Sequence, residues 1–296
     1  MTVARASSDI SLSETSSVGC SFFAHKMDNF NDQSQPDSLV VGNNDPDNAA
    51  NVQLYFQPNG QANEAPQGNA VVVQPGGTTT FQLNNNSIES VSQLRTGGTY
   101  RVESDSPIVA YLHSPIGSQA TNDASMLLPE NAQRENYIVA SYTPWLQAYP
   151  TYFNVIAMED DTTVSWTPPA GQNTLAGAGV PGVNGGNTGE VSMNRGDTLQ
   201  VVTGGSGDVS GTLVNGDKPI WVVSGAECMN VPFGVTFCDH IEEQMLPLDY
   251  WGETYVGAHA PQRGNEDYYW RVFAGEDGVT VDTDPQQPGF PVQLDA

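Results

Sequence analysis

The segment Asp217-Lys218-Pro219-Ile220-Trp221-Val222-Val223-Ser224-Gly225 decides the fold class of this chain. Positions 219–223 are all apolar, with β-branched and aromatic side chains, which is typical of a strand covered on both faces. Ile108-Val109-Ala110-Tyr111-Leu112 has the same character. By contrast, Thr163-Val164-Ser165-Trp166 alternates, as expected of a strand with one face in water. Fully covered central strands and half-buried outer strands require more than one layer, so the pattern favours β-sandwiches.

The rest of the chain has the same all-β character. Short runs of β-branched and aromatic residues lie between turns rich in Gly (30 residues) and Pro (20 residues). The one helical candidate is a turn or two in residues 239–246. The predicted strands span residues 71–73, 78–83, 99–103, 108–113, 137–142, 153–158, 164–166, 199–203, 220–224, 255–258, 268–274 and 279–283.

An internal repeat sets the expected domain organisation. Residues 153–164 resemble residues 270–281, which lie 117 positions later, and Met126-Leu127-Leu128-Pro129 recurs as Gln244-Met245-Leu246-Pro247. Residues 39–56 resemble a further copy of the first of these segments. We therefore predict tandem β-sandwich modules of about 115 residues; the alternative is a propeller-like closed β assembly of the same repeats. The predicted parts are a leader with the first strands (1–36), module one (37–150), module two (151–264) and the start of a truncated third module (265–296).

The same repeat predicts that the chain is a fragment, cut inside a repeating unit and followed by further modules.

The charge of the chain restricts its partners. Asp plus Glu number 34 against 9 Lys plus Arg, which gives a formal net charge of −25 and a pI near 4.1. So few cations exclude a nucleic acid partner and disfavour an anionic membrane surface.

No apolar run approaches the roughly 18–20 residues of a membrane helix, and residues 1–20 lack the core of a signal peptide. We therefore expect no direct membrane insertion. A protein or glycan ligand and divalent cations remain as partners.

Acidic turns form one candidate site. Asp277-Gly278, placed between two predicted strands, is a strong hairpin signal, and Asp160-Asp161 has the same place in the repeat. The alternative interpretation is that the clustered carboxylates bind Ca²⁺, which prefers several oxygen ligands. No other cofactor is expected. The candidate Ca²⁺ ligands are Glu159, Asp160, Asp161, Glu276 and Asp277.

The cysteines carry information about the compartment. Cys228 and Cys238 are ten positions apart without a CxxC motif, whereas zinc would require further Cys or His at short spacing. A disulfide is the favoured interpretation and implies an oxidising compartment; two buried thiols are the alternative. The third cysteine is Cys20.

Several of these residues carry a resemblance to a known family. Residues 217–225, Cys228 and Cys238-Asp239-His240-Ile241-Glu242-Glu243-Gln244-Met245-Leu246-Pro247, followed by Trp251-Gly252, resemble the IgGFc-binding protein N-terminal domain family. Gly19-Cys20-Ser21-Phe22-Phe23 fits the start of the pattern, so the resemblance covers residues 19–296. It implies an extracellular or cell-surface protein of the bacterial type. The family is named for binding the Fc part of immunoglobulin G.

The sequence offers little catalytic machinery. It contains no G-x-S-x-G, no H-E-x-x-H and no phosphate-binding loop. Asp239, His240, Glu242 and Glu243 form the one dense titratable group, from which a hydrolase acting on polysaccharide or peptide could be built. We expect the chain not to be an enzyme.

Aromatic residues gather at two equivalent places and form either inter-sheet core or an exposed platform for a protein or sugar ligand. The resulting prediction is a secreted or cell-surface binding and adhesion module, with a hydrolase and a structural spacer as alternatives. The candidate ligand-binding residues are Trp145, Tyr149, Tyr152, Trp251, Tyr268 and Trp270.

Overall fold

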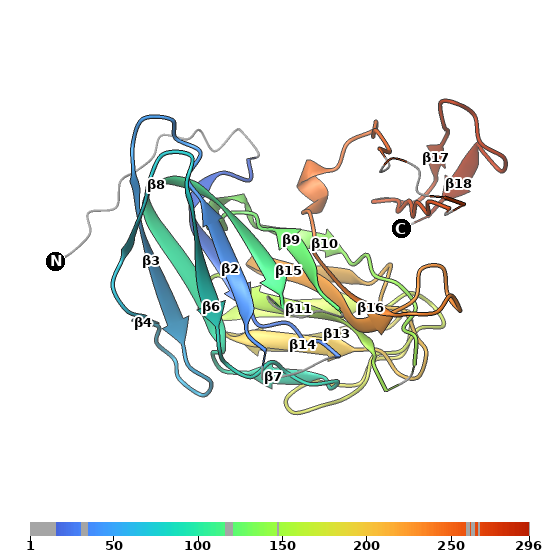
Figure 1. Ribbon diagram of the computed structural model, residues 1–296. Helices are drawn as coiled ribbons and strands as arrows, with labels where there is room; N and C mark the ends of the chain where they lie inside the picture. The colour runs from blue at the N-terminus through green and yellow to red at the C-terminus, as the bar shows by residue number, and fades with distance from the viewer. Residues whose placement is uncertain are drawn as a thin grey trace.

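Two long strands, β8 (Thr99–Ser114) and β15 (Leu213–Met229), organise the structure, a computed structural model shown in Figure 1. Each is the centre of an eight-stranded antiparallel sheet that curls into two layers. We call the sheet around β8 the first half and the sheet around β15 the second half. The structure describes residues 16–30, 35–115, 121–146, 148–258, 261, 264, 265 and 267–295.

The first half is built on the two ends of β8. Its beginning pairs with β1 and β3, whereas its end pairs with β2 and β9. Strands β4 and β5 extend the sheet beside β3, and β6 extends it beside β2. The other strands of this half are β1 (Gly19–His25), β2 (Asp37–Gly42), β3 (Ala50–Gln57), β4 (Ala65–Pro66), β5 (Val71–Val73), β6 (Thr78–Leu83) and β9 (Asp123–Met126).

The second half follows the same order of pairing. The beginning of β15 pairs with β10 and β12, and its end pairs with β11 and β16. Strand β13 lies beside β12, and β14 lies beside β11. The strands are β10 (Arg134–Ile138), β11 (Thr151–Ala157), β12 (Thr162–Thr167), β13 (Gly189–Met193), β14 (Thr198–Val202), β16 (Asp239–Gln244) and β7 (Gln93–Arg95), which pairs with β14.

The remaining elements are short. The turn η1 (Glu130–Ala132) lies between the halves, and η2 (Leu248–Tyr250) follows β16. Beyond it, β17 (Val279–Val281) pairs with β18 (Val292–Leu294), and Figure 1 shows this C-terminal part apart from the two main sheets. The all-β prediction with sandwich-like halves is confirmed, and no closed propeller is present in the part of the chain that the structure describes. The module boundaries stay a prediction.

The face-by-face burial of β15 confirms the interpretation of its apolar run. Trp221 and Val223 pack into a core shared with the first half, whereas Ile220 and Val222 pack into the core of the second half. Both faces are therefore covered. For residues 108–112 this prediction is wrong, because burial alternates there and Tyr111 is 40% exposed. Val164 and Trp166 are buried on one face of β12, as the alternation predicts.

Three local predictions are wrong. Residues 239–244 form strand β16 rather than a helical turn, because their polar side chains are buried alternately. Residues 255–258 and 268–274 do not form strands. The acidic turns do not close hairpins: β11 and β12 flank Asp160-Asp161 but pair with β15 and not with each other, and β17 after Gly278 pairs with β18.

Side chains of β9 join the two halves edge to edge. Backbone N–H groups on alternate residues of β16 donate to side-chain oxygens on alternate residues around β9, which follows the two-residue period of a strand. The bonds run from Glu242 N to Asp123 Oδ2 at 3.0 Å, from Gln244 N to Ser125 Oγ at 2.7 Å, and from His240 N to Thr121 Oγ1.

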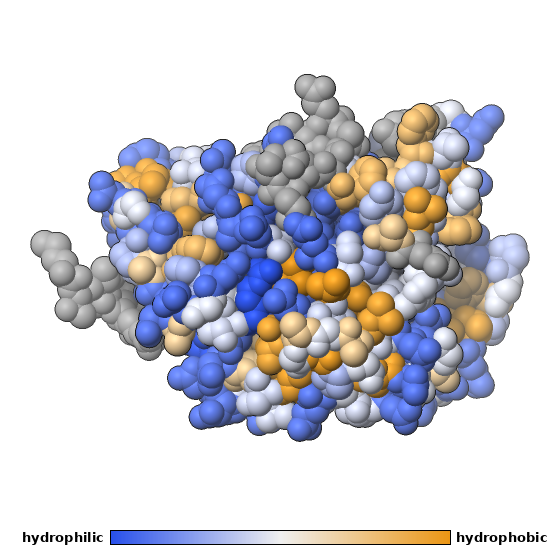
Figure 2. All heavy atoms as spheres, turned by 90° about the horizontal axis from the view of Figure 1, so that it is seen from below, coloured by the Kyte–Doolittle hydropathy of each residue, from blue (hydrophilic) through white to orange (hydrophobic). Residues whose placement is uncertain are grey.

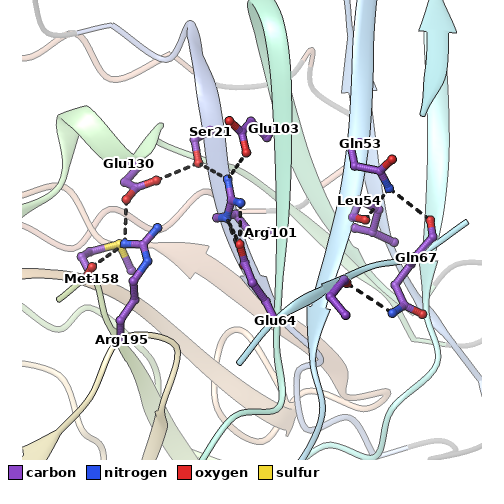
Figure 3. A network of polar contacts seen from close by, with 11 residues as sticks. Ser21, Gln53, Leu54, Glu64, Gln67, Arg101, Glu103, Glu130, Met158 and Arg195 are labelled. Atoms are coloured by element: carbon purple, nitrogen blue, oxygen red, sulfur yellow. Dashed lines mark hydrogen bonds and ion pairs between the residues drawn. The ribbon is translucent and has the colours of Figure 1, made fainter. Parts of the chain in front are cut away.

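A charged network makes a second connection between the halves (Figure 3). The Arg195 guanidinium lies 2.7 Å from Glu130 Oε1, donates to the carbonyl oxygen of Met158, and sits 4.9 Å from the ring centroid of Phe23 on β1. Ser21 Oγ donates to Glu130 at 2.7 Å and accepts from Arg101. Arg195 thereby links the second half to β1 of the first.

Candidate functional site: the disulfide loop

Cys228 and Cys238 form a disulfide that closes the connection between β15 and β16. Their Cα atoms lie 5.2 Å apart, and the two strands hold them there because β15 and β16 pair up to Met229 and Asp239. The predicted disulfide is confirmed, and the alternative of two thiols is wrong. We call residues 229–237 the disulfide loop.

The disulfide loop presents apolar side chains to solvent. Phe233 is 59% exposed and Phe237 is 96% exposed, and Val231 and Val235 are each 52% exposed. Phe237 has a φ of 71°, which is unusual for a bulky side chain and costs energy unless its surroundings enforce it. Its neighbour Cys238 is bonded to Cys228, so the disulfide restrains the backbone at Phe237.

An aromatic group adjoins the base of this loop. The backbone N–H of Trp145 donates to the carbonyl oxygen of Cys228 at 3.0 Å. The rings of Trp145 and Tyr149 are stacked with centroids 6.4 Å apart, and Phe30 meets Tyr149 edge-on at 4.6 Å. Trp145, Leu146 and Phe30 are 43%, 45% and 39% exposed. We call this group together with the disulfide loop the loop surface.

Contiguous exposed apolar area is uncommon on soluble proteins and marks interaction sites. Figure 2 shows that apolar residues gather on the face seen from below, between hydrophilic ones. The loop surface differs from a merely apolar area in being held by a covalent bond and in containing a residue with strained backbone.

Buried acidic groups lie beneath the loop surface. Asp28, in the segment before Phe30, and Glu227, next to Cys228, are 1% and 4% exposed. Ser90 N donates to Asp28 Oδ2 at 2.5 Å, and Ser90 Oγ donates to Glu227 Oε1 at 2.5 Å. Burial raises the pKa of both carboxyls, and for Asp28 the nearby charge of Glu227 raises the pKa further.

A second buried group lies on β2 and β16. Burial, followed by the charge of Glu242, raises the pKa of Asp37 to about 8. Burial likewise raises the pKa of Glu242 well above its usual range and lowers the pKa of His240. His240 Nε2 lies 3.4 Å from Glu242 Oε2, so this contact joins two groups whose neutral forms are favoured. Burial therefore favours the neutral forms of Glu242 and His240 over an ion pair between them.

The structure separates the predicted ligand-binding residues. Trp145 and Tyr149 belong to the loop surface, whereas Tyr152 is fully buried and its hydroxyl donates to the Asp28 carbonyl oxygen at 2.7 Å. Tyr152 therefore belongs to the core. Trp251 is half-buried, and Tyr268 and Trp270 are 39% and 61% exposed in the C-terminal part. These six residues do not form one platform.

The predicted Ca²⁺ ligands lie in two separate exposed turns. Glu159, Asp160 and Asp161 connect β11 to β12, and Glu276 and Asp277 precede β17. Asp160 Oδ1 accepts from the backbone N–H of Arg195 at 3.1 Å, which gives it a structural partner. Within the described ranges, no group of three or more His, Cys, Asp or Glu side chains is arranged to hold a metal ion. Calcium binding stays a prediction.

Sequence reasoning missed the buried acidic groups. Asp28 stands beside Met27 and Asp37 beside Ser38, and no local pattern marks either carboxyl as buried. His240 and Glu242 were predicted as members of a titratable group, but they are 1% and 2% exposed and face the interior. Asp239, by contrast, is exposed.

Comparisons with known proteins point to one family. No curated protein and no solved structure matched the chain. No helix in the described residues is long and apolar enough to cross a membrane. The family described as "IgGFc binding protein" matches residues 123–296, which include the disulfide, the segment 238–247 and the C-terminal part. The resemblance seen in the sequence is confirmed, and because the match covers more than half of its length, this chain belongs to the IgGFc binding protein family.

Proposed function

We propose that this chain is a non-enzymatic binding module that takes a protein ligand outside the cell through the loop surface. Membership of a family named for binding supports a binding role. The disulfide supports an oxidising compartment such as the extracellular space. The observation that carries the proposal is the group of exposed apolar side chains on the disulfide loop, whose two ends the disulfide joins. Phe237 is the most exposed of them, at 96%.

The chemistry of the loop surface suits a protein partner. Aromatic side chains anchor protein interfaces because they bury a large area at a small cost in conformational entropy. The disulfide and the strands that flank it restrict the loop before a ligand arrives, so less ordering is required on binding.

An alternative hydrolase at residues 239–243 receives less support. A general acid or base must reach the proton that it transfers. His240 and Glu242 are almost completely shielded from solvent and hydrogen-bonded to each other, so a substrate would not contact them in this conformation. We propose no catalytic residue.

The Fc fragment of immunoglobulin G is the first defined ligand to test, because it gives the family its name. Binding of Fc by the intact chain is measured by biolayer interferometry, with Fab as the comparison. We expect Val235→Ser to weaken Fc binding at least tenfold. Val72→Ser is the matched control, since Val72 on β5 is 54% exposed and Val235 is 52% exposed. Equal loss in both variants, or none in Val235→Ser, would place binding elsewhere; no binding of Fc would show that Fc is not the ligand.

A further inference from the structure

A groove opens on the first half, away from the disulfide loop. It lies where β3, β6 and the beginning of β8 approach one another, has a volume of about 330 Å³ and is open to solvent. Small-molecule sites begin at about 300 Å³, so the groove is large enough for one or two sugar rings. It is lined by Leu54, Phe56, Gln67, Gln82, Asn84, Asn85 and Tyr100.

One wall of the groove is aromatic. The rings of Phe56 and Tyr100 are stacked with centroids 4.3 Å apart and an angle of 21° between their planes. Tyr100 is only 4% exposed, so the half-buried Phe56 gives the wall its accessible part. The Tyr100 hydroxyl accepts the backbone N–H groups of Asn84 and Asn85 at 3.0 and 3.2 Å. These bonds fix the ring and position the two asparagines that follow β6.

The rest of the lining is made of amides. The lining amides are those of Gln67, Gln82, Asn84 and Asn85, and an amide group both donates and accepts hydrogen bonds. Gln67 Nε2 already donates to the Ala65 carbonyl oxygen at 3.4 Å and Asn85 Nδ2 to that of Gly98 at 3.2 Å, so the exposed Gln82 and Asn84 are the amides offered to a ligand. The backbone N–H of Gln67 donates to the Leu54 carbonyl oxygen at 2.8 Å, and Figure 3 shows these two residues side by side. No charged side chain lines the groove, although the chain has 34 acidic residues.

The second half shows how such a groove is closed. Trp166 pairs with Val214 on β15 as Leu54 pairs with Val102 on β8. Trp166 is fully buried, and its Nε1 donates to Thr174 Oγ1 at 3.1 Å. The connection that contains Thr174 covers Trp166 there, whereas Leu54 forms the buried floor of the groove and is 6% exposed.

We propose that this groove binds an uncharged saccharide. A pyranose ring has an apolar C–H face, which fits an aromatic wall, and a rim of hydroxyls that donate and accept hydrogen bonds. The amides match that rim in both roles, and the lack of charge favours neutral sugars over acidic ones. This site is independent of the loop surface and of the protein ligand proposed for it.

The test uses the intact chain made in a bacterial host, so that the sequon Asn85-Asn86-Ser87 carries no glycan in the groove. Neutral trisaccharides of glucose, mannose, xylose and N-acetylglucosamine and an acidic trisaccharide of galacturonic acid are screened by saturation-transfer NMR at up to about 10 mM. Affinities of the binders follow from calorimetry. We expect at least one neutral trisaccharide to bind more tightly than the acidic one.

Variants then locate the site. Gln82→Ala removes one amide and should weaken binding about tenfold, the loss of one well-placed hydrogen bond. Leu54→Trp copies the residue of the second half, fills the groove and should abolish binding. Gln74→Ala, an exposed glutamine of the same half outside the groove, is the matched control. If Leu54→Trp does not fold, Gln82→Ala with Gln67→Ala replaces it. No binding by any neutral trisaccharide, or binding that survives these folded variants, overturns the proposal.

Discussion

Asp28 and Glu227 are brought together by one residue, Ser90, whose backbone N–H donates to Asp28 and whose hydroxyl donates to Glu227. Asp28 follows β1 of the first half, and Glu227 belongs to β15 of the second. Two carboxyls at such close quarters, removed from water, are stable only if at least one is protonated. The contact between the two halves beneath the loop surface therefore depends on the protonation of at least one of these carboxyls.

The buried carboxyls make stability depend on pH. The pKa of Asp37 is about 8 in the folded chain, and the pKa values of Asp28, Glu227 and Glu242 are also raised. The folded state therefore holds protons that the unfolded state has released, and stability falls as pH rises toward 8. Asp37, whose pKa lies near 8 in the folded chain and near the ordinary value in the unfolded chain, contributes a slope of about 1.4 kcal/mol per pH unit between these two values.

The histidines act in the opposite direction but over a lower range. Burial lowers the pKa of His25 to about 4 and also lowers that of His240, so their contribution grows as pH rises toward 6.5 and is constant above it. We expect urea unfolding to give a free energy that decreases between pH 6.5 and 8. Asp37→Asn should flatten this dependence, with the exposed Asp105→Asn as control. A free energy that rises over this interval would contradict the account.

The disulfide should stabilise the folded chain by about 3 kcal/mol, because it restricts a short loop in the unfolded state. We expect the double variant Cys228→Ser, Cys238→Ser to unfold at a lower urea concentration while keeping its β-rich circular dichroism. Cys20→Ser, which leaves the disulfide intact, is the control. An unchanged midpoint in the double variant would show that the pairing of β15 with β16 is sufficient without the bond.

Arg195 should stabilise the connection between the halves. Its guanidinium contacts Glu130 and Phe23 but its side chain is 38% exposed, so solvent weakens the ion pair. We expect Arg195→Ala to cost about 1 kcal/mol in urea unfolding, and Arg195→Lys to recover only part of this because lysine lacks the planar fork. A cost in Arg195→Ala that disappears entirely in 1 M salt would assign the effect to charge alone.

Trp166 should be among the most costly residues to replace in the second half. It is fully buried, and its loss removes both packing and the bond to Thr174. We expect Trp166→Leu to cost about 3 kcal/mol and to speed amide exchange in residues 174–183. Ser165→Ala, at a half-buried neighbouring position of β12, is the control. A free energy of unfolding in Trp166→Leu that stays as high as in this control would contradict the expectation.

The sequence predicts the fold better than it predicts the site. Apolar runs such as residues 220–223 mark central strands because burial on both faces leaves a signal at every position. In strand β16 every second residue is buried, as in a strand with one covered face. The buried residues are His240, Glu242 and Gln244, which are polar, so a hydrophobic pattern does not reveal the strand. Tyr255 and Trp270 have strand-forming side chains without a sheet to pair with, so propensity alone fails there.

The site depends on contacts between distant parts of the chain. The disulfide could be predicted because its two cysteines are close in sequence. Asp28, Ser90 and Glu227 are separated by 62 and 137 positions and meet only in the folded chain. The sequence predicts a role for Trp145 because aromatic residues gather around it. Its contact with Cys228, however, depends on how the connection after β10 passes the end of β15.

Hydrogen–deuterium exchange of the intact chain, with and without an excess of the Fc fragment, tests the proposed role of the loop surface most directly. The account predicts slower exchange in residues 229–237 and 143–149 when the ligand is present, with little change in β17 and β18. Protection confined to other parts of the chain, or no protection in the disulfide loop, would contradict it.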